Sequence, residues 1–253
     1  EPDHLEHYNN DYNSLKTAYL CFLNNLASDG TAILCNDDPT LRDLKSTLDR
    51  RIITYSVQSD PAASADYYAV NPVLEAGRTV FDLYYQGTLA APKVILGVPG
   101  RHNIANATGA LALAASLGLD PAEVAPALSK FTGVARRFEV IGTAGGVTVI
   151  DDYAHHPTEI RATLEAARAS KGRIICIFQP HRYSRTAAFL NDFARAFTAA
   201  DLLFLHRVYP AGEAPLPGAT SATLAALIRT SSHIEVIQDD DLEALEAEAA
   251  ATA

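Results

Sequence analysis

The chain has 253 residues, of which 48% are hydrophobic and 20% are charged, a balance typical of a globular protein. Its formal net charge of −10 argues against a nucleic-acid-binding surface, which needs a basic field. The longest apolar-rich run, residues 110–119, is too short to span a bilayer, and no basic, apolar-cored leader opens the sequence. We therefore expect a soluble cytoplasmic protein with no nucleic-acid or membrane partner, in which Cys21, Cys35 and Cys176 are buried, reduced thiols.

The first part of the sequence alternates between predicted helices and strands. Residues 11–27 carry apolar side chains at helical spacing, and a short strand at 32–35 follows. A helix from about Leu41 and a strand at 52–55 continue an alternation that is typical of a parallel sheet. Residues 67–98 contain three β-rich runs joined by turns, which predicts an antiparallel edge or a hairpin insertion.

Two predicted helices then lead into a junction. An alanine-rich helix follows the turn at Pro99 and Gly100, and a second helix covers residues 121–128. The pattern restarts at Phe138, so we place a domain boundary near residues 132–136 and expect domains at 1–134 and 135–253.

The second domain is predicted to contain four successive strand–helix units, which describes a doubly wound α/β fold. Its predicted strands are residues 139–142 with 147–151, then 173–178, 202–206 and 234–237.

Three loops of this domain each follow a predicted strand and precede a predicted helix: residues 151–157, 179–186 and 207–215. Ligands of open parallel sheets bind beyond the carboxyl ends of the strands, so we expect these loops to meet at one edge. The side chains gathered there are Tyr153, His155, His156, His181, Arg182 and Arg185. Two arginines three residues apart suit a carboxylate or phosphate. The alternative is that Arg182 packs against a neighbouring helix end and Arg185 is solvated.

Metal binding is the alternative for the histidines. A zinc hydrolase could use His155 and His156, but adjacent loop residues tend to point apart, and no cysteine ligands accompany them. His156 is also a candidate helix cap. At the start of the sequence, Asp3 and His4 combine oxygen and imidazole in a way that suits a divalent cation.

The segment PGRHNIANA, residues 99–107, is a further candidate site. Gly100 exposes the backbone, and Asn103 and Asn106 lie three apart, on one face of a helix. Side-chain amides at that spacing can bind the edge of a heterocycle. The alternative is that Asn103 caps the helix and Asn106 is buried or solvated.

Taken together, DDYAHHPTE, FQPHRYSRT, VYPAGE, PGRHN..NA, ARRF and EPDH resemble the Mur ligase family, and among its members those that join L-alanine to UDP-N-acetylmuramate. The resemblance extends over essentially all 253 residues. It implies an α/β fold: the C-terminal part of a P-loop-type central ATPase domain, followed by a Rossmann-like domain with a parallel sheet. It also implies that ATP phosphorylates the muramate carboxylate and that the alanine amine attacks the acyl phosphate.

The resemblance assigns roles to individual residues. His4 would help to bind Mg²⁺ (or Mn²⁺), while His102, Asn103 and Asn106 would face ATP, the two asparagines near adenine. Arg137 and Asp152 would approach the ATP phosphates and ribose. The residues on the substrate side would be Tyr153, His155, His181, Arg182 and Arg185, the last four of them catalytic.

The sequence also departs from the family pattern. No GxxxxGK[ST] loop occurs in it. We expect that an N-terminal sugar-nucleotide domain and the end of the C-terminal domain also lie outside these residues. We therefore expect a fragment that does not turn over ATP alone. A murein peptide ligase, which joins a whole peptide to UDP-N-acetylmuramate, and a noncatalytic nucleotide-binding module remain alternatives, and the oligomeric state is not predicted.

Overall fold

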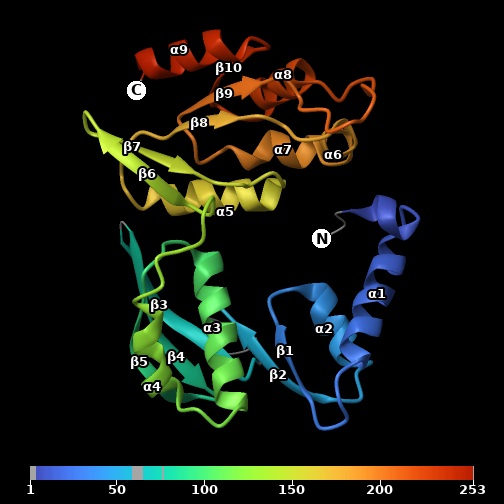
Figure 1. Ribbon diagram of the computed structural model, residues 1–253, viewed down its shortest axis with the longest axis vertical. Coiled ribbons are helices and arrows are strands. Elements are labelled where there is room, and N and C mark those ends of the chain that lie inside the picture. Colours follow the sequence, from blue (N-terminus) through green and yellow to red (C-terminus); the bar gives the residue numbers. More distant parts are fainter. Residues whose placement is uncertain (1–3, 59–64, 76, 253) are drawn as a thin grey trace. The chain divides into compact units, whose positions relative to one another are not determined.

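The computed structural model describes residues 4–58, 65–75 and 77–252. The chain divides into two compact units, Glu1–Thr132 and Gly133–Ala253, and each is described by itself (Figure 1). The division lies close to the boundary expected after residue 134. Among the described residues, none of the helices combines the length and the apolar character that crossing a membrane requires.

The first unit begins with helices whose caps are local. A short 3-10 helix, η1 (Leu5–Tyr8), precedes α1 (Tyr12–Asn24). The Asp11 carboxylate caps α1 by accepting hydrogen bonds from the backbone N–H groups of Asn13 and Ser14. Helix α2 (Pro39–Lys45) is capped in the same way by Asp38, and its proline occupies a position where no N–H is needed.

A five-stranded mixed sheet forms the centre of this unit, in the order β1-β2-β3-β4-β5. Its strands are β1 (Thr31–Cys35), β2 (Arg51–Ser56), β3 (Tyr67–Glu75), β4 (Arg78–Tyr85) and β5 (Thr88–Leu96). The first three run parallel, and β3, β4 and β5 form an antiparallel meander. The predicted antiparallel edge is therefore confirmed.

Helices α3 (Arg101–Ser116) and α4 (Pro121–Leu128) cover one face of this sheet (Figure 1). Ile104 and Leu111 of α3 pack with Phe81 and Leu83 of β4, and all four side chains are fully buried. The period of about 3.6 residues brings these positions of α3 onto the same side, so the alanine-rich sequence forms a closely packed helix–sheet contact.

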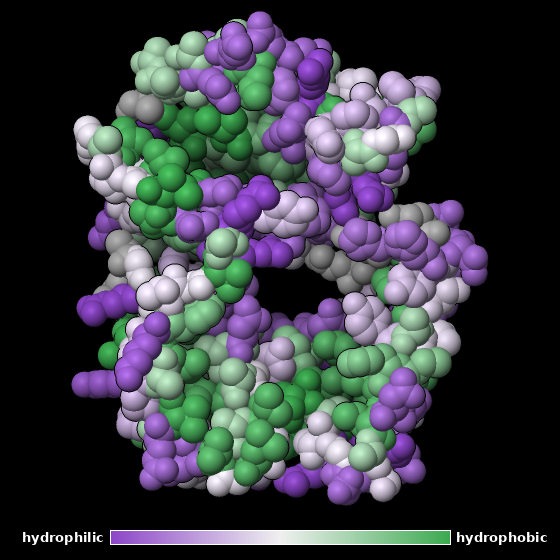
Figure 2. Space-filling model, in the orientation of Figure 1, coloured by the Kyte–Doolittle hydropathy of each residue, from purple (hydrophilic) through white to green (hydrophobic). Residues whose placement is uncertain are grey.

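The second unit begins with a hairpin, which corrects one prediction. Strands β6 (Glu139–Ala144) and β7 (Val147–Asp151) pair antiparallel in a sheet of their own, so β7 is not a strand of the parallel sheet. The cause is the two-residue turn Gly145–Gly146, in which both residues have positive φ, as a tight hairpin turn requires. The hairpin exposes Val140 and Ile141, and Figure 2 shows hydrophobic surface in this region.

The parallel sheet of the second unit contains β8 (Ile175–Phe178), β9 (Leu202–His206) and β10 (Glu235–Asp239), in the order β10-β9-β8. Leu203 and Leu205 of β9 face a core built with α5 (Pro157–Arg168), α7 (Leu190–Ala196) and α8 (Ser221–Ser231). Leu202 and Phe204 face α9 (Leu242–Thr252) on the opposite side. Because successive side chains of a strand point to opposite faces, β9 is buried along its whole length.

The expectation of three buried thiols is wrong for Cys21, which lies on the exposed side of α1. Cys35 and Cys176 are partly buried, and no disulfide joins the three. Burial raises the pKa of the Cys35 thiol, and it raises that of Cys176 to about 12, so both are neutral thiols near pH 7.

Candidate functional site

The loop from Asp152 to His156, between β7 and α5, is held by its own acid. One carboxylate oxygen of Asp152 accepts a hydrogen bond from the Ala154 N–H (2.8 Å), and the other accepts one from the Phe138 N–H (2.8 Å). The Tyr153 N–H donates to the carbonyl oxygen of Arg136 at 2.8 Å. Asp152 therefore fixes the loop against the segment before β6, and each of its oxygens keeps a lone pair for a further partner.

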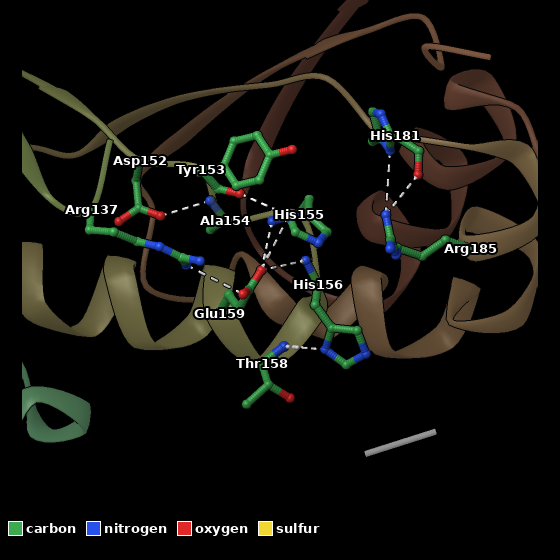
Figure 3. A network of polar contacts seen from close by, with 10 residues as sticks. All are labelled: Arg137, Asp152, Tyr153, Ala154, His155, His156, Thr158, Glu159, His181 and Arg185. Atoms are coloured by element: carbon green, nitrogen blue, oxygen red, sulfur yellow. Dashed lines mark hydrogen bonds and ion pairs between the residues drawn. The ribbon is translucent and has the colours of Figure 1, made fainter. Parts of the chain in front are cut away.

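Glu159, in the first turn of α5, is the centre of the polar network drawn in Figure 3. Its Oε2 accepts hydrogen bonds from the backbone N–H groups of His155 (3.0 Å) and His156 (3.2 Å), and its Oε1 lies 3.4 Å from Nη1 of Arg137. Sequence reasoning gave Glu159 no role. The spacing of a cap and a glutamate three residues later, here His156 and Glu159, was the signal that could have found it.

The ionised form of Glu159 is favoured in the folded unit. Although burial acts in the opposite direction, the pKa of Glu159 is lowered by the His155 and His156 N–H groups, by the charge of His155 and by the Arg137 hydrogen bond. The carboxylate also lies at the N-terminus of α5, where the helix dipole favours negative charge.

The two adjacent histidines point in different directions. His156 is buried, its ring meets the Phe189 ring edge-on at 4.6 Å, and its Nδ1 accepts from the Thr158 N–H at 3.4 Å. It is the N-cap of α5, which confirms the capping prediction. The ring of His155 instead lies 5.2 Å from that of Tyr153 and 6.4 Å from that of His181. This divergence does not favour a zinc site that uses both residues.

The loop after β8 carries the cationic part of the site. Nη1 of Arg185 lies 3.5 Å from both Nδ1 and the carbonyl oxygen of His181 (Figure 3). Arg185 is only 7% exposed, so the solvated alternative is wrong for it. The predicted loop is also shorter than expected, because helix α6 (Tyr183–Ala188) begins inside it and holds Arg185.

His181 has the ring of His155 and the ring of Tyr209 as neighbours. Its ring stacks on that of Tyr209, which follows β9, with centroids 5.4 Å apart. Burial lowers the pKa of His181, and the charges of Arg185, Arg182 and His155 lower it further, against a smaller opposing effect of Glu213. The imidazole is therefore neutral near pH 7 and able to accept a proton.

The structure thus brings together residues from three separate segments of the second unit, although β7 lies outside the parallel sheet. Tyr153, His155, His181 and Arg185 form a continuous series of neighbours, with Arg137 joined to it through Glu159. The prediction that these loops meet is confirmed for the second unit.

In the first unit, the predicted nucleotide-facing residues lie in the first two turns of α3. The N-cap of this helix is Gly100, with φ of 102°, so the alternative that Asn103 caps it is wrong. The Asn103 side-chain amide donates to the Pro99 carbonyl oxygen at 2.7 Å, while His102 and Asn106 are exposed. Arg101 also donates to the carbonyl oxygen of Val57 (2.8 Å), which ties the start of α3 to the segment after β2.

The candidate metal ligand His4 is exposed, and its ring lies 6.3 Å from that of His7 in a stacked arrangement. Asp3, its predicted companion, lies outside the described residues. Within residues 4–58, 65–75 and 77–252, no group of three or more His, Cys, Asp or Glu side chains is arranged to hold a metal ion.

The sequence matches two models of consecutive Mur ligase domains. Residues 1–114 match the Mur ligase middle domain, and residues 136–253 match the Mur ligase glutamate ligase domain. The chain therefore belongs to the Mur ligase family, and the expected fold class is confirmed.

Within the family, similar curated proteins include UDP-N-acetylmuramate–L-alanine ligases. That of Halorhodospira halophila is 42% identical over 96% of this chain and 50% of its own length. That of Agrobacterium fabrum is 41% identical over 92% of this chain and 50% of its own length. The chain thus spans about half the length of the curated relatives it matches.

Solved structures agree. The UDP-N-acetylmuramate–alanine ligase of Thermotoga maritima superimposes with a TM-score of 0.70 at 27% identity, covering 94% of this chain and 49% of its own. The MurF ligase of the same organism, solved with ADP, gives a TM-score of 0.73 at 18% identity, over 100% of this chain and 54% of its own. At that identity, the second comparison shows a shared fold.

Proposed function

We propose that this chain supplies parts of two domains of an ATP-dependent ligase that joins L-alanine to UDP-N-acetylmuramate through an acyl phosphate, in peptidoglycan precursor synthesis. Residues 1–134 would be the latter part of the central ATP-binding domain, and residues 135–253 the C-terminal domain. The observation that carries the proposal is the 42% identity to an L-alanine-adding ligase over 96% of the chain.

The face formed by Tyr153, His155, His181, Arg182 and Arg185 is the proposed substrate side. Arg182 and Arg185 supply fixed positive charge close to a neutral imidazole. Phosphoryl and acyl-phosphate chemistry depends on such positioned charge more than on covalent help from the protein. When the amine attacks the acyl phosphate, a C–N bond forms, inorganic phosphate leaves, and the surplus proton of the amine passes to a base. His181 suits that role because its pKa is lowered.

Nucleotide contacts are proposed separately for each unit. In the first unit, the start of α3 carries His102, Asn103 and Asn106. Because Asn106 is exposed, its side-chain amide is accessible to the adenine ring of the nucleotide. In the second, the free lone pairs of Asp152 could accept from ribose hydroxyls, and Arg137 could contact a phosphate.

A Mg²⁺ or Mn²⁺ ion is part of the proposal only through His4. The described residues do not assemble a metal site around it, so no step is derived through the ion. Magnesium in nucleotide sites is commonly held by phosphates and water with few protein ligands.

The decisive experiment uses the complete protein encoded by the gene that contains this chain. Phosphate release from ATP is measured with UDP-N-acetylmuramate and either L-alanine or a tripeptide that begins with L-alanine. We expect release with L-alanine, whereas preference for the tripeptide would establish the peptide-adding alternative. Absence of nucleotide turnover with both amines would refute the proposal and favour the noncatalytic module.

Variants test the assigned roles. His181→Asn should reduce kcat at least about a hundredfold if the imidazole is the general base. Glu165→Gln, on the exposed side of α5, is the control and should retain wild-type activity. The isolated 253-residue chain should release no phosphate in an alanine-dependent manner, because it lacks a GxxxxGK[ST] loop.

A further inference from the structure

Two loops of the second unit are joined beyond the ends of their strands. We call residues 179–182 the β8 loop and residues 207–220 the β9 loop. The Tyr209 N–H donates to the Pro180 carbonyl oxygen, and the Arg182 N–H donates to the Tyr209 carbonyl oxygen, both at 2.8 Å. Together with the stacked rings of His181 and Tyr209, these bonds continue the parallel pairing of β8 and β9.

A second connection runs through Glu213. Its Oε2 accepts a hydrogen bond from the Ser184 N–H (2.9 Å), and its Oε1 accepts one from the Ser184 hydroxyl (2.6 Å). Ser184 lies in the first turn of α6, one residue before Arg185. The carboxylate of the β9 loop therefore binds the start of the helix that carries Arg185, with both of its oxygens engaged.

The backbone of both loops is strained at non-glycine residues. Arg182 has φ of 70° and ψ of 136°, and Ala211 has φ of 48° in the turn whose Glu213 N–H donates to the Pro210 carbonyl oxygen. Such conformations persist only where surrounding contacts determine them, and they gather at functional sites. Tyr209 binds the Arg182 N–H directly, and the bonds of Tyr209 to Pro180 and of Glu213 to Ser184 lie on either side of Arg182. These bonds contribute to holding its backbone conformation.

We propose that Glu213 is a positioning residue, which fixes the start of α6 through Ser184 so that His181 and Arg185 face the anionic group of the substrate together. The proposal rests on the proposed function for the identity of that group. It gives Glu213 no contact with the reacting atoms.

The positioning effect of Glu213 can be distinguished from the direct effect of its negative charge on anion binding. A carboxylate near Arg182 weakens the local positive field, so its removal alone should strengthen the binding of an anion. Loss of positioning has the opposite consequence, because Arg185 would no longer be held beside His181. The sign of the change in anion affinity therefore distinguishes the two effects.

The test uses this chain, inorganic phosphate as the probe, and NMR signals of the His181 imidazole. Three variants are compared with the wild type: Glu213→Gln, which removes the charge; Ser184→Ala, which removes the hydroxyl and keeps the charge; and Glu235→Gln, an exposed control on β10. Amide hydrogen exchange is followed in α6, and exchange in α8 reports whether the unit as a whole remains folded.

Positioning predicts that both Glu213→Gln and Ser184→Ala bind phosphate about fivefold to tenfold more weakly, with faster exchange in α6 and unchanged exchange in α8. The Glu235→Gln control should match the wild type. Tighter phosphate binding by Glu213→Gln, or unchanged binding by both variants despite faster exchange in α6, would overturn the proposal.

If the wild-type chain does not bind phosphate, the proposed anion-binding role of this face is refuted. The positioning role of Glu213 is then tested by the His181 NMR signal. A shift of that signal in Ser184→Ala, where the charge at residue 213 is retained, would still support positioning. An unchanged signal there, with unchanged exchange in α6, would refute it.

Discussion

Replacement of Glu159 by alanine tests the polar network at the start of α5 most directly. The change removes two hydrogen bonds from the backbone N–H groups of His155 and His156, at 3.0 and 3.2 Å, to a carboxylate. Loss of a helix-capping side chain costs about 0.5–2 kcal/mol, and net hydrogen bonds to charged groups lie at about 1.5–3 kcal/mol. The Arg137 ion pair is exposed and adds only a few tenths of a kcal/mol or so.

We therefore expect Glu159→Ala to lower the free energy of unfolding of the second unit by roughly 2 kcal/mol. With a urea m-value of about 1.5 kcal/mol/M, the midpoint of the corresponding transition should fall by about 1.3 M. Far-UV circular dichroism measures the transition, and hydrogen exchange in residues 153–168 locates the loss. The matched control is Glu165→Ala, on the exposed face of the same helix, which should stay within about 0.5 kcal/mol of the wild type.

The effect should also depend on pH with a defined sign. The pKa of Glu159 is lower in the folded unit than its ordinary value of 4.5. The ionised carboxylate therefore contributes its full stability above that value, and the contribution is lost as the pH falls through the folded pKa. The difference in unfolding free energy between wild type and Glu159→Gln should accordingly shrink on acidification. Equal stabilities of Glu159→Ala and Glu165→Ala at pH 7, or a difference that grows in acid, would refute the reasoning.

Two further outcomes are expected. Gly97→Ala should destabilise the first unit by about 1–3 kcal/mol in thermal or urea unfolding, because an added Cβ would lie 2.3 Å from the backbone oxygen of Phe131. The control is Gly142→Ala, whose added Cβ meets open space and should cause no comparable loss of stability. Similar losses in both variants would contradict the close contact between Gly97 and Phe131. N-ethylmaleimide should label the exposed Cys21 much faster than Cys176, whose pKa burial raises to about 12. Mass spectrometry of the digested protein measures both labelling rates. Equal rates would show that burial does not protect the Cys176 thiol.

Local sequence patterns predicted most of the secondary structure. The helix at 121–128 was placed correctly because a proline in its first turn and helical apolar spacing act within a few residues. The hairpin at the start of the second unit was missed as a unit, although the Gly145–Gly146 pair carries its signal. The predicted strands on both sides of that pair are present as β6 and β7, and only the assignment of β7 to the parallel sheet was wrong.

The candidate site was predicted in its residue types and in the meeting of its loops. Motifs such as DDYAHHPTE and QPHRYSRT indicated the family, and rules for parallel sheets placed the loops after β8 and β9 at one edge. The contacts and the burial of each side chain were harder to predict from the sequence. Burial of Arg185, and the hydrogen bond from the Phe138 N–H to Asp152, depend on atoms that are distant in sequence.

The sequence by itself thus determined the alternation of elements, the caps and the chemical character of the loops, because these depend on interactions between near neighbours. Tertiary structure alone decided that Glu213 binds Ser184, 29 residues away, and that Arg185 is buried. The physical reason is that such contacts are chosen by the packing of whole elements, which places hydrogen-bonding groups side by side without a local pattern to announce them.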